Sequence, residues 1–221
     1  MIEPISLFSI PLFYYFVVLA FILPKIPVIG KFFNIINTAI HELGHALMTL
    51  FLQGNVKRIE LFDTSAGTTT SQSKNKLSAF FIAIAGYPFA SFFSLFAFYL
   101  YVHGYYLHLL IGLSTLFFIM LLFWIRNSYG IIWVLLFVAI NATLLYFDYA
   151  QSVRIAVLFY VVVMLTESVW SSLVVLFLSI VRPNESGDAM VLQKITHIPA
   201  FVWGLFFAAC AGFVGWKVVM F

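Results

Sequence analysis

Long runs of apolar residues, separated by short polar connections, make up most of the chain. A helix that crosses the hydrocarbon core of a bilayer needs about 20 consecutive, mostly apolar residues. The pattern predicts such helices over residues 5–24, 130–147, 155–180 and 198–221. Residues 77–125 carry no charge and are long enough for two more spans, with a natural hinge at His103-Gly104.

Residues 32–52 form a further apolar segment, which differs from the others because it carries histidine, glutamate and asparagine. The predicted fold is therefore an all-α, polytopic membrane protein of about six to seven transmembrane helices, in one membrane-embedded domain over residues 1–221. The first segment has no basic region before it and no small-residue cleavage site. We therefore expect it to remain as an anchor and not to be removed as a signal peptide.

Composition excludes a water-soluble domain. Hydrophobic residues make up 64% of the chain and charged residues 9%, against about 45–50% and about 25% in soluble proteins. We therefore expect an integral multi-pass membrane protein, in the cell membrane if the source is prokaryotic. The net charge of +3 is too small and too scattered for nucleic-acid binding. A single cysteine, Cys210, excludes an intramolecular disulfide and a thiolate zinc cluster.

Lysine and arginine in short loops indicate the orientation, since they favour the cytoplasmic side. If every segment crosses, seven basic residues fall on one side and four on the other: Lys57, Arg58, Lys74, Lys76, Arg126, Arg182 and Lys194 against Lys25, Lys31, Arg154 and Lys217. This distribution predicts a cytoplasmic N-terminus and cytoplasmic loops at 53–76, 126–129 and 181–197.

The segment 32–52 contains the motif His41-Glu42-Leu43-Gly44-His45. On a helix, His41 and His45 are four residues apart, so their imidazoles lie on one face and can bind one metal ion. Glu42 lies beside the first of them, where it can take a proton from a metal-bound water and pass it to a leaving amine. Two imidazoles and a carboxylate, with one position left open, suit zinc.

A third ligand has to come from elsewhere in the chain, and two acidic residues are the candidates. Asp188 lies in the loop before the last segment, on the same side as the carboxyl end of the motif helix, and the preceding Gly187 lets the loop bend back. Glu167 lies in the middle of the segment 155–180, where a carboxyl group is normally neutral or paired. We favour Asp188, whose alternative role is to cap the final helix.

The motif inside an apolar segment, combined with a late aspartate, resembles the site-2 protease family of intramembrane zinc metalloproteases, and more narrowly a small subset of it. Further stretches similar to that subset are 54–61 followed by Ala66-Gly67-Thr68, then Ala85-Gly86-Tyr87, Gly187-Asp188-Ala189, Ile198-Pro199 and Trp203. The resemblance implies zinc held by His41, His45 and Asp188, with Glu42 as the base. It differs from better-known members in one respect, since their third ligand is followed by glycine and Asp188 is followed by Ala189.

A β-hairpin is predicted directly after the motif helix. Residues 56–62 have strand character, residues 63–67 favour a turn, and residues 68–71 can form the return strand. Such a hairpin would lie near the metal and present an unpaired edge, to which an extended substrate could add through backbone hydrogen bonds.

The leading functional hypothesis is a zinc-dependent intramembrane endopeptidase with Glu42 as its catalytic residue. Its partners would be the lipid bilayer and a transmembrane-protein substrate, cleaved in or near its transmembrane segment. The alternative is a non-catalytic metal-binding scaffold or assembly protein, a pseudoprotease. A metal or solute carrier is a weaker third hypothesis, because the polar groups gather at one site and do not form a path. The sequence predicts no oligomeric state.

Overall fold

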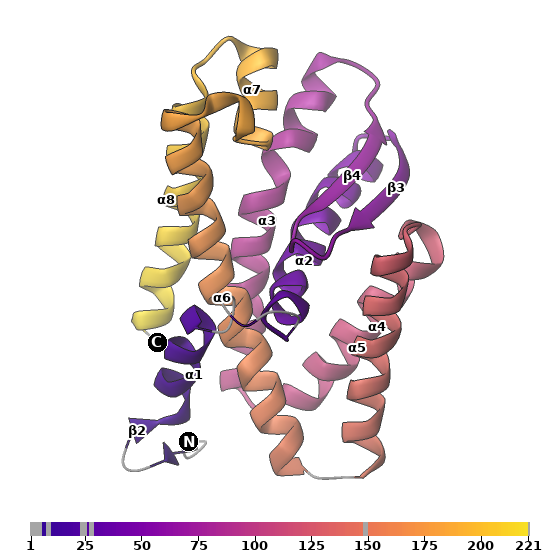
Figure 1. Ribbon diagram of the computed structural model, residues 1–221, viewed down its shortest axis with the longest axis vertical. Helices are drawn as coiled ribbons and strands as arrows, with labels where there is room; N and C mark the ends of the chain where they lie inside the picture. The colour runs from indigo at the N-terminus through magenta and orange to yellow at the C-terminus, as the bar shows by residue number, and fades with distance from the viewer. Residues whose placement is uncertain (1–5, 8–9, 23–25, 27–28, 148–149, 221) are drawn as a thin grey trace.

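The computed structural model describes residues 6–7, 10–22, 26, 29–147 and 150–220 (Figure 1). These residues form eight α-helices: α1 (Leu12–Ile22), α2 (Ile29–Phe51), α3 (Lys76–Val102), α4 (Tyr106–Phe123), α5 (Ser128–Tyr146), α6 (Ala150–Val181), α7 (Asp188–Thr196) and α8 (Ala200–Val219). Of these, α3, α4, α5, α6 and α8 are long and apolar enough to cross a membrane. The predicted all-α, multi-pass architecture is confirmed.

The first predicted span differs from the structure. Within the described residues, α1 has 11 residues, about 16 Å of helix, which is too short to cross a bilayer alone. The two-residue strands β1 (Ser6–Leu7) and β2 (Ile10–Pro11) precede it and pair with each other. Pro11 has no amide hydrogen and favours the end of a strand over a helix interior, so the helix begins after it. The predicted ends of the first and last segments, 5, 24 and 221, lie outside the described residues, as does Lys25.

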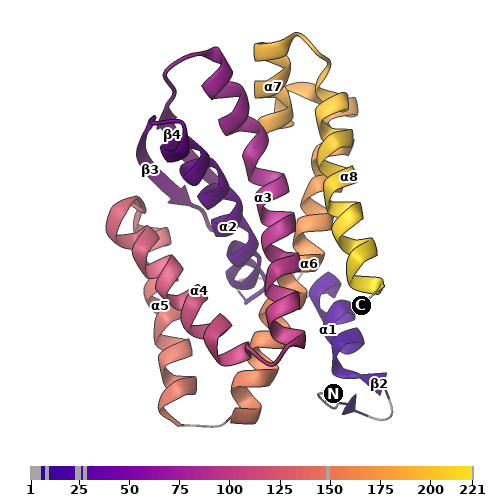
Figure 2. The same cartoon turned by 180° about the vertical axis from the view of Figure 1, so that it is seen from behind.

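Helix α2 lies inside the bundle, in contact with α3, α6 and the hairpin (Figures 1 and 2). One face of it is apolar and almost fully buried: Ile35, Ile36, Ala39, Ile40, Leu43 and Ala46. Gly44 allows α3 to approach closely, because a Cβ atom at this position would lie 2.8 Å from the Cβ of Phe89. The helix therefore has an apolar face for packing and leaves its polar face for a site.

The hairpin after α2 is also confirmed. Strand β3 (Asn55–Leu61) pairs antiparallel with β4 (Gly67–Gln72), with a register shift between Val56 and Arg58. The outer edge of β3 is occupied: the Ile59 amide donates to the Trp124 carbonyl (2.8 Å), and the Ile59 carbonyl accepts from the Arg126 amide (3.2 Å). Within the described residues, β4 has no strand on its outer side.

Two connections between helices lie at opposite ends of the bundle. The predicted hinge at His103-Gly104 is confirmed, since α3 ends just before it and Gly104 has a φ of 84°. At the other end, a 3₁₀ turn η2 (Pro183–Glu185) leads from α6 through Gly187 (φ 56°) into α7. As Figures 1 and 2 show, α7, the start of α3 and the hairpin lie at the same end of the helices.

Candidate metal centre

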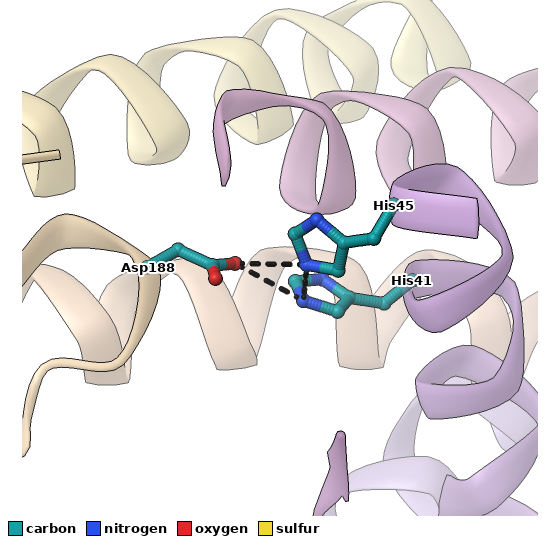
Figure 3. Close-up of side chains that lie close together, drawn as sticks. All are labelled: His41, His45 and Asp188. Carbon is teal, nitrogen blue, oxygen red and sulfur yellow. Dashed lines mark hydrogen bonds and ion pairs between the residues drawn. The ribbon is translucent and has the colours of Figure 1, made fainter. Parts of the chain in front are cut away.

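The side chains of His41, His45 and Asp188 point toward one another (Figure 3). The two Nε2 atoms of the imidazoles lie 3.0 Å apart, and each lies 3.2 Å from Oδ2 of Asp188. The histidines come from adjacent turns of α2, and the aspartate is the first residue of α7. The structure therefore brings together the two motif histidines and the favoured one of the two candidate acids.

Hydrogen bonding determines which nitrogen of His45 faces the cluster. Its Nδ1 lies 2.7 Å from the Ile82 carbonyl oxygen, which can only accept, so Nδ1 carries a hydrogen. In the neutral ring, Nε2 is then unprotonated and directs its lone pair at the Asp188 oxygen. Acceptors this close require a cation between them, either an added proton on an imidazole or a metal ion.

The donor set fits a metal ion in both chemistry and spacing. All three ligand atoms lie within 4.8 Å of one another. Ligand atoms of a tetrahedral zinc site lie about 3.3 Å apart, close to the spacing of 3.0 Å and 3.2 Å found here. Helix α3 leaves room for this arrangement only because residue 86 is glycine, since a Cβ atom there would lie 2.5 Å from Nε2 of His45.

Asp188 comes directly after a tight turn at Gly187. Gly187 has φ 56° and ψ −121°, a backbone conformation that residues with a side chain rarely adopt. Burial opposes ionisation of the Asp188 carboxyl, but attraction to a positively charged His45 and hydrogen bonds from both imidazoles outweigh it and hold its pKa below the ordinary value. The carboxylate is therefore ionised at neutral pH, the form that a metal ligand requires. Asp188 starts the separate helix α7 and does not cap α8, as the alternative role would require.

Glu42 lies beside the cluster but does not belong to it. Its side chain is buried, with 4% of the residue exposed. The Thr69 hydroxyl on β4 lies 2.6 Å from its Oε2, and Gly67 packs so closely that a Cβ atom there would lie 2.7 Å from its Oε1. The carboxylate is therefore held from the hairpin side, one residue along α2 from His41.

A cavity of about 480 Å³ contains the cluster and Glu42. Strand β4 contributes Gly67, Thr68, Thr69 and Ser71, and Ser73 follows it; α3 contributes Ala79, Ile82, Ala83 and Tyr87; and the α7 region contributes Gly187 and Val191. The Tyr87 ring packs against His41, with ring centroids 4.4 Å apart. The cavity therefore has a polar wall formed by β4 and a largely apolar wall formed by α3.

Glu167, the other candidate ligand, lies elsewhere. It is half-buried on α6 and belongs neither to the three-residue cluster found among the described residues nor to the cavity lining.

The sequence did not single out Thr69 or Ile82, and it included Gly86 and Tyr87 only within a short stretch of family resemblance. Thr69 gives no local signal, because its contact with Glu42 depends on the packing of the hairpin on α2. Ile82 acts through its backbone carbonyl, which every residue type possesses. Such supporting contacts are found only in the tertiary structure.

Replacing Gly86 by alanine is expected to disrupt the cluster. The added methyl group would lie 2.5–2.6 Å from ring atoms of both histidines, so the imidazoles must move apart, and we expect metal affinity to fall by at least about tenfold. Zinc content and thermal unfolding of the purified variant would test this. Gly212→Ala is the matched control, because a Cβ atom there meets nothing within 4 Å, and equal metal loss in both variants would contradict the prediction.

Fold and site together define an integral, multi-pass membrane protein with a His/His/Asp cluster suited to a metal ion. The family model described as Peptidase M50B-like matches residues 12–218. The chain belongs to this family, which is one of the site-2 protease type, so the expected family resemblance is confirmed. Membership identifies it as a membrane metalloprotease in general terms. Searches of curated proteins and of solved structures found no match.

Proposed function

We propose that the protein is a zinc-dependent intramembrane endopeptidase that hydrolyses a peptide bond in or near a transmembrane segment of another membrane protein. The observation that carries this proposal is the convergence of His41, His45 and Asp188 in the same cavity as the buried carboxylate of Glu42. Two nitrogen donors and one oxygen donor leave a coordination position for water or substrate, as in catalytic zinc sites.

In this proposal, His41, His45 and Asp188 would hold a zinc ion, which when bound would supply a Lewis acid able to activate water and polarise a carbonyl group. Glu42 accepts the proton of the attacking water at its carboxylate and returns it to the departing amine. The Ile82 carbonyl keeps the hydrogen of His45 on Nδ1, so that the lone pair of Nε2 stays available for a metal ion.

The free edge of β4 suits the binding of an extended substrate. Thr69 stands opposite Ile59, whose amide and carbonyl groups point away from β4 toward Trp124 and Arg126. In an antiparallel pair of this kind, both residues direct their peptide groups outward, so the Thr69 groups face the free edge. Gly67 stands opposite Leu61 in the same way, and both Leu61 groups bond the side chain of Asn127.

A substrate strand that pairs with β4 would place its backbone along the polar wall of the cavity. An α-helical segment hides its peptide groups in internal hydrogen bonds and has to unwind before water can attack a carbonyl. New hydrogen bonds to Gly67 and Thr69 would compensate for the bonds lost on unwinding. By the distribution of lysine and arginine, this end of the bundle faces the cytoplasm.

Removal of zinc tests the proposal directly. We expect the purified protein in detergent or liposomes to cleave a panel of single-span membrane proteins, to lose this activity with a chelator, and to regain it with added zinc. Acidification should have the same effect as the chelator, because the ligands bind metal only in their deprotonated forms. Cleavage that persists at full rate after zinc has been removed to below one-tenth of the protein concentration would refute the proposal.

A further inference from the structure

Thr69 has two contacts of different kinds, and together they connect the free edge of β4 to Glu42. Its peptide groups face that edge, while its hydroxyl group lies 2.6 Å from Oε2 of Glu42 and 3.1 Å from the Glu42 carbonyl oxygen. A hydroxyl has one hydrogen to donate, and the shorter distance assigns it to the carboxylate. A strand residue thus donates a charge-assisted hydrogen bond to the proposed base.

We propose that Thr69 is a positioning residue for Glu42, and that it makes the placement of this carboxylate depend on the strand that the substrate joins. This inference rests on the proposed function. A glutamate side chain has three rotatable bonds, so burial alone does not define where its oxygens lie. The Thr69 hydroxyl fixes Oε2, and Gly67, two residues earlier on the same strand, packs against Oε1.

Both contacts with the carboxylate therefore come from residues of β4 whose peptide groups face the free edge. A substrate that pairs with Gly67 and Thr69 would restrict the motion of β4, and hence the motion of Glu42. A bound peptide that does not pair would leave the carboxylate less well oriented. Thr69 should consequently affect turnover more than substrate affinity, because its hydroxyl hydrogen goes to the base, whereas strand pairing with a substrate would use its peptide groups.

The hydroxyl could instead serve only to attach the hairpin to α2, and the chain offers a control for that role. The Thr38 hydroxyl on α2 donates to the Ser65 carbonyl in the turn of the hairpin (2.8 Å). This bond also attaches the hairpin to α2, but its acceptor is not Glu42. Thr38→Val and Thr69→Val each remove one such bond at nearly constant side-chain volume.

The experiment compares Thr69→Val, Thr69→Ser and Thr38→Val with wild type in the zinc-loaded protein. Loss of a hydrogen bond to a charged group predicts that kcat of Thr69→Val falls about 10- to 100-fold, with KM within about twofold. Thr69→Ser keeps the hydroxyl and should restore kcat to within about threefold of wild type. Thr38→Val should keep kcat within about threefold of wild type as well.

A second readout does not depend on activity. With glutamate labelled with ¹³C at the side-chain carboxyl, the Glu42 signal is identified by its absence in Glu42→Gln. We expect this signal to shift in Thr69→Val, to return in Thr69→Ser, and to stay in place in Thr38→Val. An unmoved Glu42 signal in Thr69→Val, wild-type kcat in that variant, or an equal loss of kcat in Thr38→Val would each overturn the inference. If wild type cleaves no substrate, the protease proposal fails, while the labelling still decides whether Thr69 holds Glu42.

Discussion

Replacing Glu42 by glutamine is expected to reduce peptide cleavage by about 10²- to 10⁴-fold, the contribution typical of general acid–base catalysis. The amide has nearly the same size as the carboxylate, so it should fill the same space between Thr69 and Gly67. It cannot accept a proton from water at neutral pH. Because Glu42 is not one of the three metal-cluster residues, we expect the variant to retain zinc at the wild-type level.

Cleavage and zinc content have to be measured on the same variant, because together they distinguish loss of the base from loss of the metal. Glu185→Gln is the matched control, because Glu185 is exposed in the turn η2 and lies outside the cavity. It should cleave at the wild-type rate. If Glu42→Gln also cleaves at that rate, Glu42 is not the base. If every functional assay, including those of assembly with partner proteins, is insensitive to Glu42→Gln, the non-catalytic scaffold hypothesis becomes the better explanation.

Replacing Asp188 by alanine is expected to remove the proposed third metal ligand. Zinc affinity should fall by more than about 100-fold, the upper range for loss of a residue that only supports a ligand. Asp188 supplies the only carboxylate oxygen in the cluster found among the described residues. Without it, two neutral imidazoles remain, and both the charge and the number of donors are too low for tight binding. Zinc per chain, measured by elemental mass spectrometry, and competition with a chelator of known affinity would give the change.

Replacing Glu167, the other candidate acid, by glutamine is expected to leave zinc binding unchanged. Because Glu167 is absent from both the cluster and the cavity lining, its variant should keep about one zinc per chain. Circular dichroism and gel filtration in detergent would establish that Asp188→Ala remains folded, and Asp188→Asn, which preserves shape, gives a second measure. Zinc retained in both Asp188 variants and lost in Glu167→Gln would move the third ligand to α6.

Most of the helices could be predicted because each depends on a local property of the chain. The uncharged residues 77–125, interrupted at His103-Gly104, indicated α3 and α4. Gly104 adopts the positive φ that is common just after the end of a helix, and it separates α3 from α4. The strands β3 and β4 followed from residue types around a turn. The first segment was harder, since its apolar composition suited a full span while Pro11 restricted the helix to begin after it.

The sequence by itself determined that this is a multi-pass membrane protein, and that His41, Glu42 and His45 lie together, because helical periodicity acts over four residues and hydropathy over about 20. Only the tertiary structure brings Asp188, and not Glu167, into the cluster with His41 and His45. Only it places Thr69 and Gly67 on Glu42 and the Ile82 carbonyl on His45. These contacts join segments far apart in the chain, so they depend on how helices and hairpin pack. Packing is determined by the burial of many side chains at once, so no local pattern of residues predicts it.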